Sequence, residues 1–306
     1  MHSIINTIVP IFVIILLGIL IRHMGHLPST ITGSLNRLVY YVAIPAMIFR
    51  EVAKASFQAH FNTLLLLGTL IPVIVIFVFG LVIVLLFPIP RQKCGTFLQS
   101  SFHGNLGYIG LAVAYYLLGK KGFTSASILA GFLVLLQNFL SVLGLQIFSG
   151  GPVPGNRLLF FTKKIIGNPI ILSAILGIIF SIFNIQLPLI IDRSLGILSG
   201  MALPLALLVI GASLTFNLIK SNINLILCTG LLKLFLLPAL GIAAYRCTGL
   251  SSAQFLPGLI LLASPTATVT YVMAGEMRGS LELASAAVSL STLFSFLSFI
   301  FWLGLF

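Results

Sequence analysis

The sequence predicts an all-α polytopic membrane protein, and composition is the main reason. Of its 306 residues, 59% are hydrophobic and only 7% are charged, and the mean hydropathy is +1.21. A soluble domain carries about 25% charged residues, and a water-soluble fold of this size cannot hide so much apolar surface. The alternating pattern of β-barrel strands is missing from the sequence. Soluble enzymes, disordered chains and collagen-like proteins are therefore excluded.

Ten apolar runs are long enough to cross a bilayer as helices. A helix needs about 20 apolar residues to span the hydrocarbon core, and charged or turn-rich breaks divide this chain at that spacing. The first run lacks a basic leader and a cleavage site of small residues, so we expect a span rather than a signal peptide. The predicted spans are 3–22, 33–52, 62–87, 94–118, 125–149, 165–184, 196–216, 223–246, 254–275 and 283–305.

The charged residues predict an orientation rather than a nucleic-acid partner. The formal net charge is +12, but the basic residues are scattered singly or in pairs, without the ribbon that follows a phosphate backbone. Ten spans place both termini on one side, where the loops hold six basic residues against eight on the other side. Because cytoplasmic loops are enriched in Lys and Arg, we expect both termini outside and the loop 150–164 in the cytoplasm.

The sequence predicts no metal, no cofactor and no enzymatic site. Cys94, Cys228 and Cys247 lack paired spacing and a nearby histidine cluster, so neither a zinc site nor a disulfide framework is expected. An enzyme needs a nucleophile beside a positioned base, and no such Ser/His/Asp arrangement or intramembrane pair of carboxylates is present.

An internal repeat divides the chain into 1–149, the linker 150–164 and 165–306. Both halves contain a proline, a glycine eight residues later, a Leu-Pro pair and then a proline after two apolar residues. Five spans per repeat force the halves to insert with opposite orientations. Inverted repeats are typical of secondary transporters with a site at the midplane, although an ancient duplication in a protein that does not transport would leave the same pattern. The matching residues are Pro10, Gly18, Pro28 and Pro45 in the first half, and Pro169, Gly177, Pro188 and Pro204 in the second.

The fourth and ninth spans, which are equivalent in the two repeats, are predicted to break near their centres. The fourth carries Asn105 among glycines, and Asn is a good N-cap for a half-helix beginning just after it. The ninth carries Ser264 and Pro265, an N-cap and first-turn signature. The predicted crossover and hinge residues are Gly110, Pro265 and Thr270, and the predicted substrate-binding residues are Gly104, Asn105, Gly107, Ser264, Pro265, Thr266, Thr268 and Lys233.

Two half-helix N-termini facing each other in the bilayer would attract an anion. Their N–H groups and partial positive charge suit a carboxylate, and the hydroxyls of Ser264, Thr266, Thr268 and Thr270 would add donors. Simple kinks packed against small residues are the alternative for each span taken alone. Two breaks at equivalent places in the repeats favour a binding site.

One basic residue, Lys233, lies at the centre of an apolar run. A lysine there requires a cavity or a partner. Three roles are open: attraction of an anionic substrate, support of the broken ninth span, or donation to carbonyls freed by Pro238. The four acidic residues lie at span ends or in loops, which disfavours cation transport through carboxylates. Sodium held by carbonyls and hydroxyls stays open as a coupling ion. His103 could titrate, but a lone histidine in a span more often bonds a neighbouring helix.

In order and spacing, these features resemble the auxin efflux carrier family, which includes bacterial malate/malonate-type permeases. The likeness covers nearly the whole chain. The resemblance implies a homodimer and ten spans in two inverted repeats, whose fourth and ninth helices are broken and cross. It further implies that the first two helices of each repeat form a scaffold, while the other three move like an elevator. Asn105 matches the asparagine that binds the substrate carboxylate. The strongest pieces are 35–45, 105–110, Lys233 with Pro238, and Ser264-Pro265 leading to 271–274.

The sequence thus predicts a secondary transporter of small organic anions, with membrane lipids as its other partners and no nucleic acid. Asn105 and the ninth span would hold the carboxylate, and Lys233 would assist. The short central loop points to the plasma membrane of a prokaryote. One alternative is a sodium- or proton-coupled symporter of organic acids on a related fold, and a second is a membrane receptor that does not transport.

Overall fold

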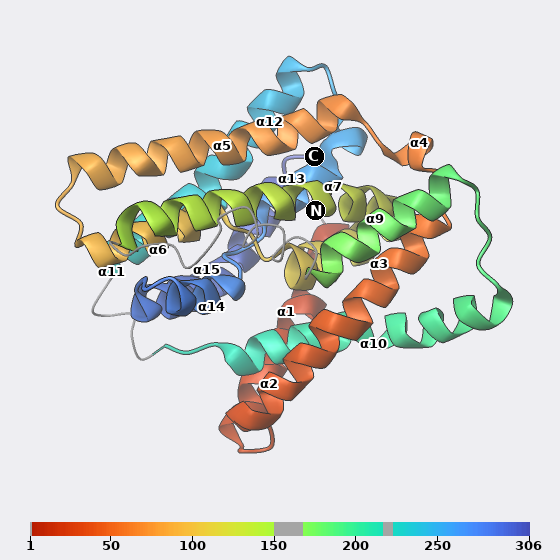
Figure 1. Cartoon of the computed structure of the whole chain (residues 1–306), viewed down its shortest axis with the longest axis horizontal. Coiled ribbons are helices and arrows are strands. Elements are labelled where there is room, and N and C mark those ends of the chain that lie inside the picture. The colour runs from red at the N-terminus through yellow and green to blue at the C-terminus, as the bar shows by residue number, and fades with distance from the viewer. Residues whose placement is uncertain (1, 150–167, 217–222) are drawn as a thin grey trace. The chain divides into compact units, whose positions relative to one another are not determined.

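All regular structure in the described part of the chain is helical. The computed structural model describes residues 2–149, 168–216 and 223–306, and no strand occurs among them (Figure 1). The predicted linker 150–164 lies outside these residues. The helices before it are α1 (His2–His23), α2 (Ser29–Leu38), the π-helix η1 (Val39–Ala43), α3 (Ile44–Ala53), α4 (Phe57–His60), α5 (Thr63–Leu86), α6 (Arg91–Phe102), the π-helix η2 (Leu106–Gly110) and α7 (Leu111–Ser149).

The second half has the same all-helical character. Over the two halves, each of the ten predicted spans contains at least one helical segment. The helices are α9 (Pro169–Ile182), α10 (Leu189–Ser213), α11 (Ile223–Leu231), the π-helix η4 (Leu232–Leu236), α12 (Leu237–Cys247), α13 (Ser252–Ala263), α14 (Val269–Glu276) and α15 (Leu281–Leu303).

Among the described residues, six helical stretches are long and apolar enough to cross a membrane. A helix of 20 residues is about 30 Å long, the thickness of the hydrocarbon core. Two shorter apolar helices, α9 and α13, fall below that length. The chain is therefore a membrane protein with several apolar helices. The six stretches are Ile4–His23, Thr63–Leu86, Leu106–Phe148, Leu189–Ser213, Ile223–Cys247 and Leu281–Leu303.

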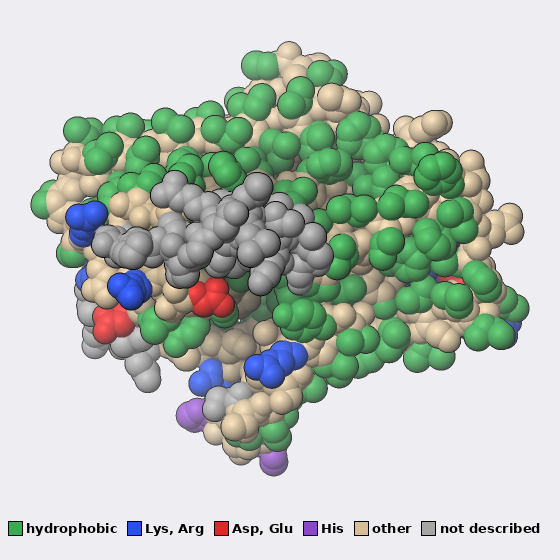
Figure 2. All heavy atoms as spheres, viewed as in Figure 1, with side chains coloured by type: hydrophobic (Ala, Val, Ile, Leu, Met, Phe, Trp, Pro, Cys, Tyr) green, Lys and Arg blue, Asp and Glu red, His purple; other side chains and the backbone are tan. Residues whose placement is uncertain are grey.

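Large apolar side chains stay exposed along these stretches. Leu20 of α1, Leu85 of α5 and Ile197 of α10 are 54%, 70% and 78% exposed. Hydrophobic side chains cover most of the described surface on the face drawn in Figure 2, and charged side chains there are few. Such faces are stable against lipid tails but not against water.

The helices form two compact units, and each unit draws on both halves of the chain. The first unit comprises Met1–Asn62, Gly107–Phe132 and Thr162–Ser213, and the second comprises Thr63–Leu106, Leu133–Phe161 and Leu214–Phe306. The repeats 1–149 and 165–306 stay a prediction, because they concern sequence likeness rather than compactness.

In the first unit, α1 packs closely along α10 because two glycines meet. A Cβ atom on Gly211 would collide with the carbonyl oxygen of Ile15, and one on Gly18 would collide with that of Leu208. Small residues of this kind let two membrane helices approach until their backbones touch. The backbone contact therefore depends on the absence of both side chains.

The other close pair in the first unit is α3 with α9. A Cβ atom on Gly177 of α9 would lie 2.9 Å from Cβ of Val52, and the rings of Phe49 and Phe180 pack edge to face with centroids 5.1 Å apart. Gly18 and Gly177 are equivalent in the predicted repeat. Each therefore lies where the first helix of one half meets the second helix of the other half.

An ion cluster joins α3 to α10 at one end. The Arg50 Nε atom lies 2.8 Å from Asp192 Oδ1, and the Lys54 Nζ atom lies 2.9 Å from Asp192 Oδ2. Arg50 also contacts Glu51, with 3.1 Å between Nη1 and Oε1. The cluster ties the C-terminal end of α3 to the first turn of α10.

We expect Asn168→Ala to destabilise the first unit by about 1 kcal/mol. The Asn168 side-chain oxygen accepts hydrogen bonds from the backbone N–H groups of Ile170 and Ile171, at 3.0 and 3.3 Å, and so caps α9. Alanine leaves both donors without this partner. Thermal unfolding of purified protein in detergent measures the loss. Asn168→Ser keeps an acceptor and is expected to unfold near the wild-type temperature; equal losses in both variants would contradict the capping role.

The second unit packs around Tyr245. This side chain of α12 is fully buried, and its hydroxyl lies 2.8 Å from the Thr69 hydroxyl of α5. Gly68 of α5 faces the ring, and Gly258 of α13 faces the hydroxyl. Because neither glycine carries a side chain, three helices close around one aromatic residue, which fixes the start of the broken span α13–α14.

Candidate functional site

The two predicted breaks are present and are joined by their backbones. α6 ends at Phe102 and α13 ends at Ala263. Beyond these ends, Gly104 and Thr266 form an isolated antiparallel bridge. The Asn105 N–H donates to the Pro265 carbonyl at 2.7 Å, and the Ala267 N–H donates to the His103 carbonyl at 2.9 Å. We call residues 103–105 and 264–268 the paired break. Its hydrogen bonds replace those that water cannot supply inside a membrane.

The predicted start of the second half-helix was wrong. Ser264 is the C-cap of α13 rather than an N-cap, with φ −61° and ψ 141°, and α14 begins only at Val269. Pro265 has no N–H to donate, and its carbonyl is engaged by Asn105, so the chain stays extended for the length of the bridge. On the other side, helix resumes directly after Asn105 as predicted, but as the π-helix η2.

The hydroxyls of the ninth span differ in what they already bind. The Ser264 hydroxyl donates to the Ile260 carbonyl at 2.9 Å, and the Thr266 hydroxyl donates to the Ser100 carbonyl at 3.0 Å. The buried Thr270 hydroxyl has no hydrogen-bond partner among the described residues. Thr268 is partly exposed at the N-cap of α14. Thr268 and Thr270 are therefore better placed than Ser264 and Thr266 to donate to a ligand.

Lys233 lies directly beside the paired break. Its side chain is fully buried, and Nζ donates to the Leu262 carbonyl in the last turn of α13 at 2.6 Å. A Cβ atom on Gly104 would lie 3.3 Å from this Nζ. The ammonium thus neutralises the carbonyl end of α13, where cations are favourable. It supports the broken ninth span and places one positive charge beside Gly104.

The carbonyl freed by Pro238 has other partners. Proline lacks the N–H that would bond to Leu234 four residues earlier. The Ser298 hydroxyl and the Trp302 indole N–H each donate to that Leu234 carbonyl at 2.8 Å. The carbonyl freed by Pro238 is therefore satisfied without Lys233. Of the three roles that the sequence left open for Lys233, donation to this carbonyl is wrong.

The remaining predicted residues are distributed over both units. Asn105 is 3% exposed and belongs to the second unit with Lys233 and the ninth span. Gly107 and Gly110 lie in η2 and belong to the first unit. There, a Cβ atom on Gly107 would lie 3.0 Å from the Ile170 side chain, so this glycine also permits close packing.

Several polar residues around the paired break were missed by the sequence prediction. The Gln137 side chain donates to the Phe102 carbonyl at 3.2 Å, and the Thr266 N–H donates to the Ser291 hydroxyl at 3.1 Å. The sequence did contain a signal for Ser291, because α15 carries a series of Ser and Thr residues in an apolar run. In a membrane such hydroxyls can be buried by hydrogen bonds to neighbouring helices. The most buried of them are Ser289, Ser291, Thr292, Ser295 and Ser298.

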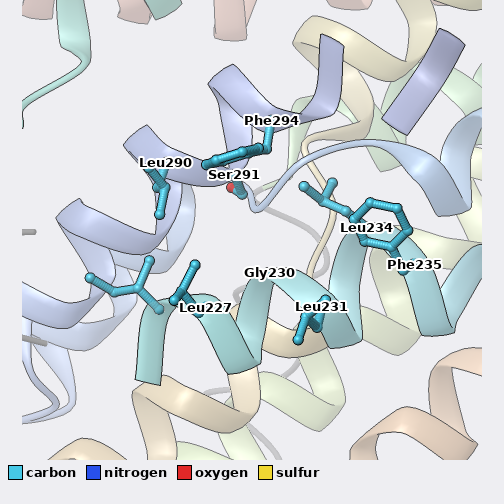
Figure 3. Close-up of a pocket in the computed structure, with 9 residues that line it drawn as sticks. Leu227, Gly230, Leu231, Leu234, Phe235, Leu290, Ser291 and Phe294 are labelled. Carbon is cyan, nitrogen blue, oxygen red and sulfur yellow. The ribbon is translucent and has the colours of Figure 1, made fainter. Parts of the chain in front are cut away.

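A small apolar cavity lies between α11–η4 and α15. Its volume is about 130 Å³, and the labelled side chains in Figure 3 come from these two stretches. Ser291 is its one polar lining residue, and no charged side chain lines it. The cavity suits hydrocarbon rather than a carboxylate, so we do not place the anion there. The described residues also contain no cluster of three His, Cys, Asp or Glu side chains able to hold a metal.

Discontinuous membrane helices are typical of the binding sites of secondary transporters. The sequence profile of the Membrane transport protein family matches residues 3–303, and the chain belongs to this family. The predicted likeness to auxin efflux carriers is thereby confirmed.

Three relatives illustrate the range of this similarity. The chain is 25% identical to an "Uncharacterized transporter" of Methanothermobacter thermautotrophicus over 303 residues, 97% of this chain and 96% of the relative. It is 27% identical to a "Putative malonate transporter" of Rhizobium meliloti over 307 residues, 96% and 93% of the two chains. It is 31% identical to "Auxin efflux carrier component 8" of Arabidopsis thaliana over 132 residues, 41% and 36% of the two chains. Two of these relatives are named as transporters and the third as an efflux carrier.

Proposed function

We propose that this protein is a secondary transporter of small organic anions, with dicarboxylates such as malonate as its main substrates. The observation that carries the proposal is the fully buried ammonium of Lys233, which lies beside Gly104 in the paired break. A buried charge in a membrane span is costly unless a partner or a function retains it. The similarity to a relative named as a malonate transporter supports a dicarboxylate.

In this proposal the carboxylate binds at the paired break near Asn105 and the first turn of α14. The N-terminus of a helix carries about half a positive charge, and at the start of α14 the N–H groups of Thr270 and Tyr271 already donate to the Ala267 and Thr268 carbonyls. Thr268 and Thr270 add hydroxyls, and Asn105 adds an amide. The Lys233 side chain is fully buried. Its positive charge would therefore attract the anion electrostatically across the backbone of Gly104, which has no side chain.

Transport would proceed by alternating access of the elevator type, in two inverted repeats of five helices. Two observations support this proposal. The first unit contains the first two helical spans of each half together with Gly107–Phe132, and the second contains the paired break with Lys233. In the first unit, the equivalent Gly18 and Gly177 both lie at contacts between the halves. The proposal includes a homodimer in a prokaryotic plasma membrane with both termini outside.

Replacing Asn105 by alanine is expected to raise the KM for malonate about tenfold to a hundredfold. A hydrogen bond to a charged group contributes about 1.5–3 kcal/mol, and tenfold in affinity corresponds to about 1.4 kcal/mol. The measurement is exchange of radiolabelled acid by purified protein in proteoliposomes, with malonate, malate and indole-3-acetate as a panel.

Asn224→Ala is the matched control for this variant. Asn224 is exposed in the first turn of α11, and its loss is expected to leave KM unchanged. If Asn105→Ala exchanged every acid of the panel as the wild type does, the assignment of the site would be wrong. Wild-type protein that binds these acids without exchanging them would be a receptor rather than a transporter.

A further inference from the structure

A buried histidine belongs to the paired break but has no role in the anion site described above. His103 is 3% exposed and directly follows the last residue of α6. Its main-chain carbonyl accepts the Ala267 N–H at 2.9 Å. Its ring Nδ1 lies 2.8 Å from the Ser141 hydroxyl and 3.4 Å from Gln99 Nε2. A titratable ring is thus fixed within the paired break, close to the proposed position of the anion.

The partners of this ring suit both of its protonation states. A serine hydroxyl donates to a bare ring nitrogen and accepts from a protonated one. The amide of Gln99 presents nitrogen in one orientation and oxygen after a half-turn, and in the structure its Oε1 has no hydrogen-bond partner among the described residues. Ser141 and Gln99 can therefore satisfy His103 with or without the additional proton.

Lys233 is the one buried charge among the described elements that surround this ring. α6 carries Arg91 and Lys93 in its first turn, far along the helix from His103. α14 and α15 carry Glu276 and Glu282, both exposed. The stretch of α7 from 133 to 149 and all of α13 carry no charged residue. Lys233 of η4, beside Gly104, therefore supplies a single positive charge at the paired break.

A dicarboxylate brings two negative charges to a site with one buried positive charge. The second negative charge is unfavourable in a membrane interior unless another cation accompanies it. Histidine is the side chain that gains a positive charge near neutral pH. We propose that His103 binds the proton that accompanies each dicarboxylate, so that one dianion and one proton move together.

The inference rests on the proposed function and specifies its coupling ion. One ring nitrogen of His103 takes a proton from water on the loading side, and the same nitrogen returns the proton to water after the dianion leaves. As the N–H bond forms, an O–H bond of hydronium breaks, and the reverse exchange takes place on release, so that no other reactant is needed.

The first test is malonate accumulation in proteoliposomes with the membrane potential clamped at zero. With the outside one pH unit more acidic than the inside, wild-type protein is expected to concentrate malonate up to about tenfold, because one proton then carries about 1.4 kcal/mol. His103→Gln is expected to abolish this accumulation. His60→Gln is the matched control, because His60 contacts Ser125 in the first unit, and it should accumulate malonate like the wild type.

The second test counts protons directly, first in the wild-type protein. Calorimetry of malonate binding to purified wild-type protein, in buffers of different ionisation enthalpy, is expected to give uptake of about one proton per malonate at neutral pH. His103→Gln is expected to bind malonate more weakly and without proton uptake.

The outcomes separate the coupling from the transport itself. Wild-type accumulation that ignores the pH difference, or full accumulation by His103→Gln, overturns the proton coupling and leaves the proposed transporter standing. Wild-type proteoliposomes that exchange no carboxylate of the panel overturn both proposals.

Discussion

Replacing Lys233 by methionine is expected to weaken malonate binding about thirtyfold while the protein stays folded. One carboxylate charge within about 8 Å of a unit positive charge gains about 2 kcal/mol at an effective dielectric constant of about 20, and this corresponds to about thirtyfold in affinity. Methionine keeps much of the apolar length but carries no charge. Equilibrium binding of radiolabelled malonate to purified protein measures the effect, and exchange in proteoliposomes should fall in parallel.

Stability should change much less than binding in this variant. The Leu262 carbonyl loses its donor, which costs about 1–3 kcal/mol, but the protein no longer buries an ammonium, whose desolvation costs several kcal/mol. Lys121→Met removes a charge from an exposed position of α7 and should bind malonate like the wild type. Wild-type affinity in Lys233→Met would show that the buried charge serves the fold alone.

The second large effect is expected from Gly211→Ala, which should destabilise the first unit by about 1–3 kcal/mol. Its new Cβ atom would collide with the Ile15 carbonyl oxygen and lie 3.1 Å from the Cα atom of Gly18. These are backbone atoms, so α1 and α10 must separate before the methyl group fits. The midpoint of thermal unfolding in detergent measures the loss.

Gly200→Ala provides the control on the same helix. A Cβ atom there meets nothing within 4 Å, and alanine favours helix over glycine by about 1 kcal/mol. We expect this control to unfold at or above the wild-type temperature. Equal unfolding temperatures for Gly211→Ala and Gly200→Ala would show that α1 and α10 are not in close backbone contact.

The sequence was sufficient to locate the breaks and the buried charge, because each depends on one or two residues in an otherwise apolar run. Asn105 among glycines, Pro265 and Lys233 stand out without knowledge of any neighbour. The gap between the fourth and fifth predicted spans was also placed correctly: within α7, Gly119 has φ 64° and ψ −165°, outside helical values.

What the sequence could not predict depends on partners distant along the chain. Lys233 bonds to Leu262, 29 residues away, and Thr266 bonds to Ser100, 166 residues away. The pairing of Gly104 with Thr266 delays the start of α14, and no local preference at Ser264 reveals it. The grouping of helices from both halves into each unit likewise follows from packing and not from the order of the spans.

The backbone hydrogen bonds across the paired break limit how the protein can move. Separating Asn105 from Pro265, and His103 from Ala267, would leave four main-chain groups without hydrogen-bond partners in the apolar interior of the membrane, at a cost of several kcal/mol for each. In the proposed transporter, residues 103–105 and 264–268 would therefore move together as one rigid piece. Access to one face of the bilayer or the other would then come from displacement of this whole piece, and not from separation of its two backbone segments.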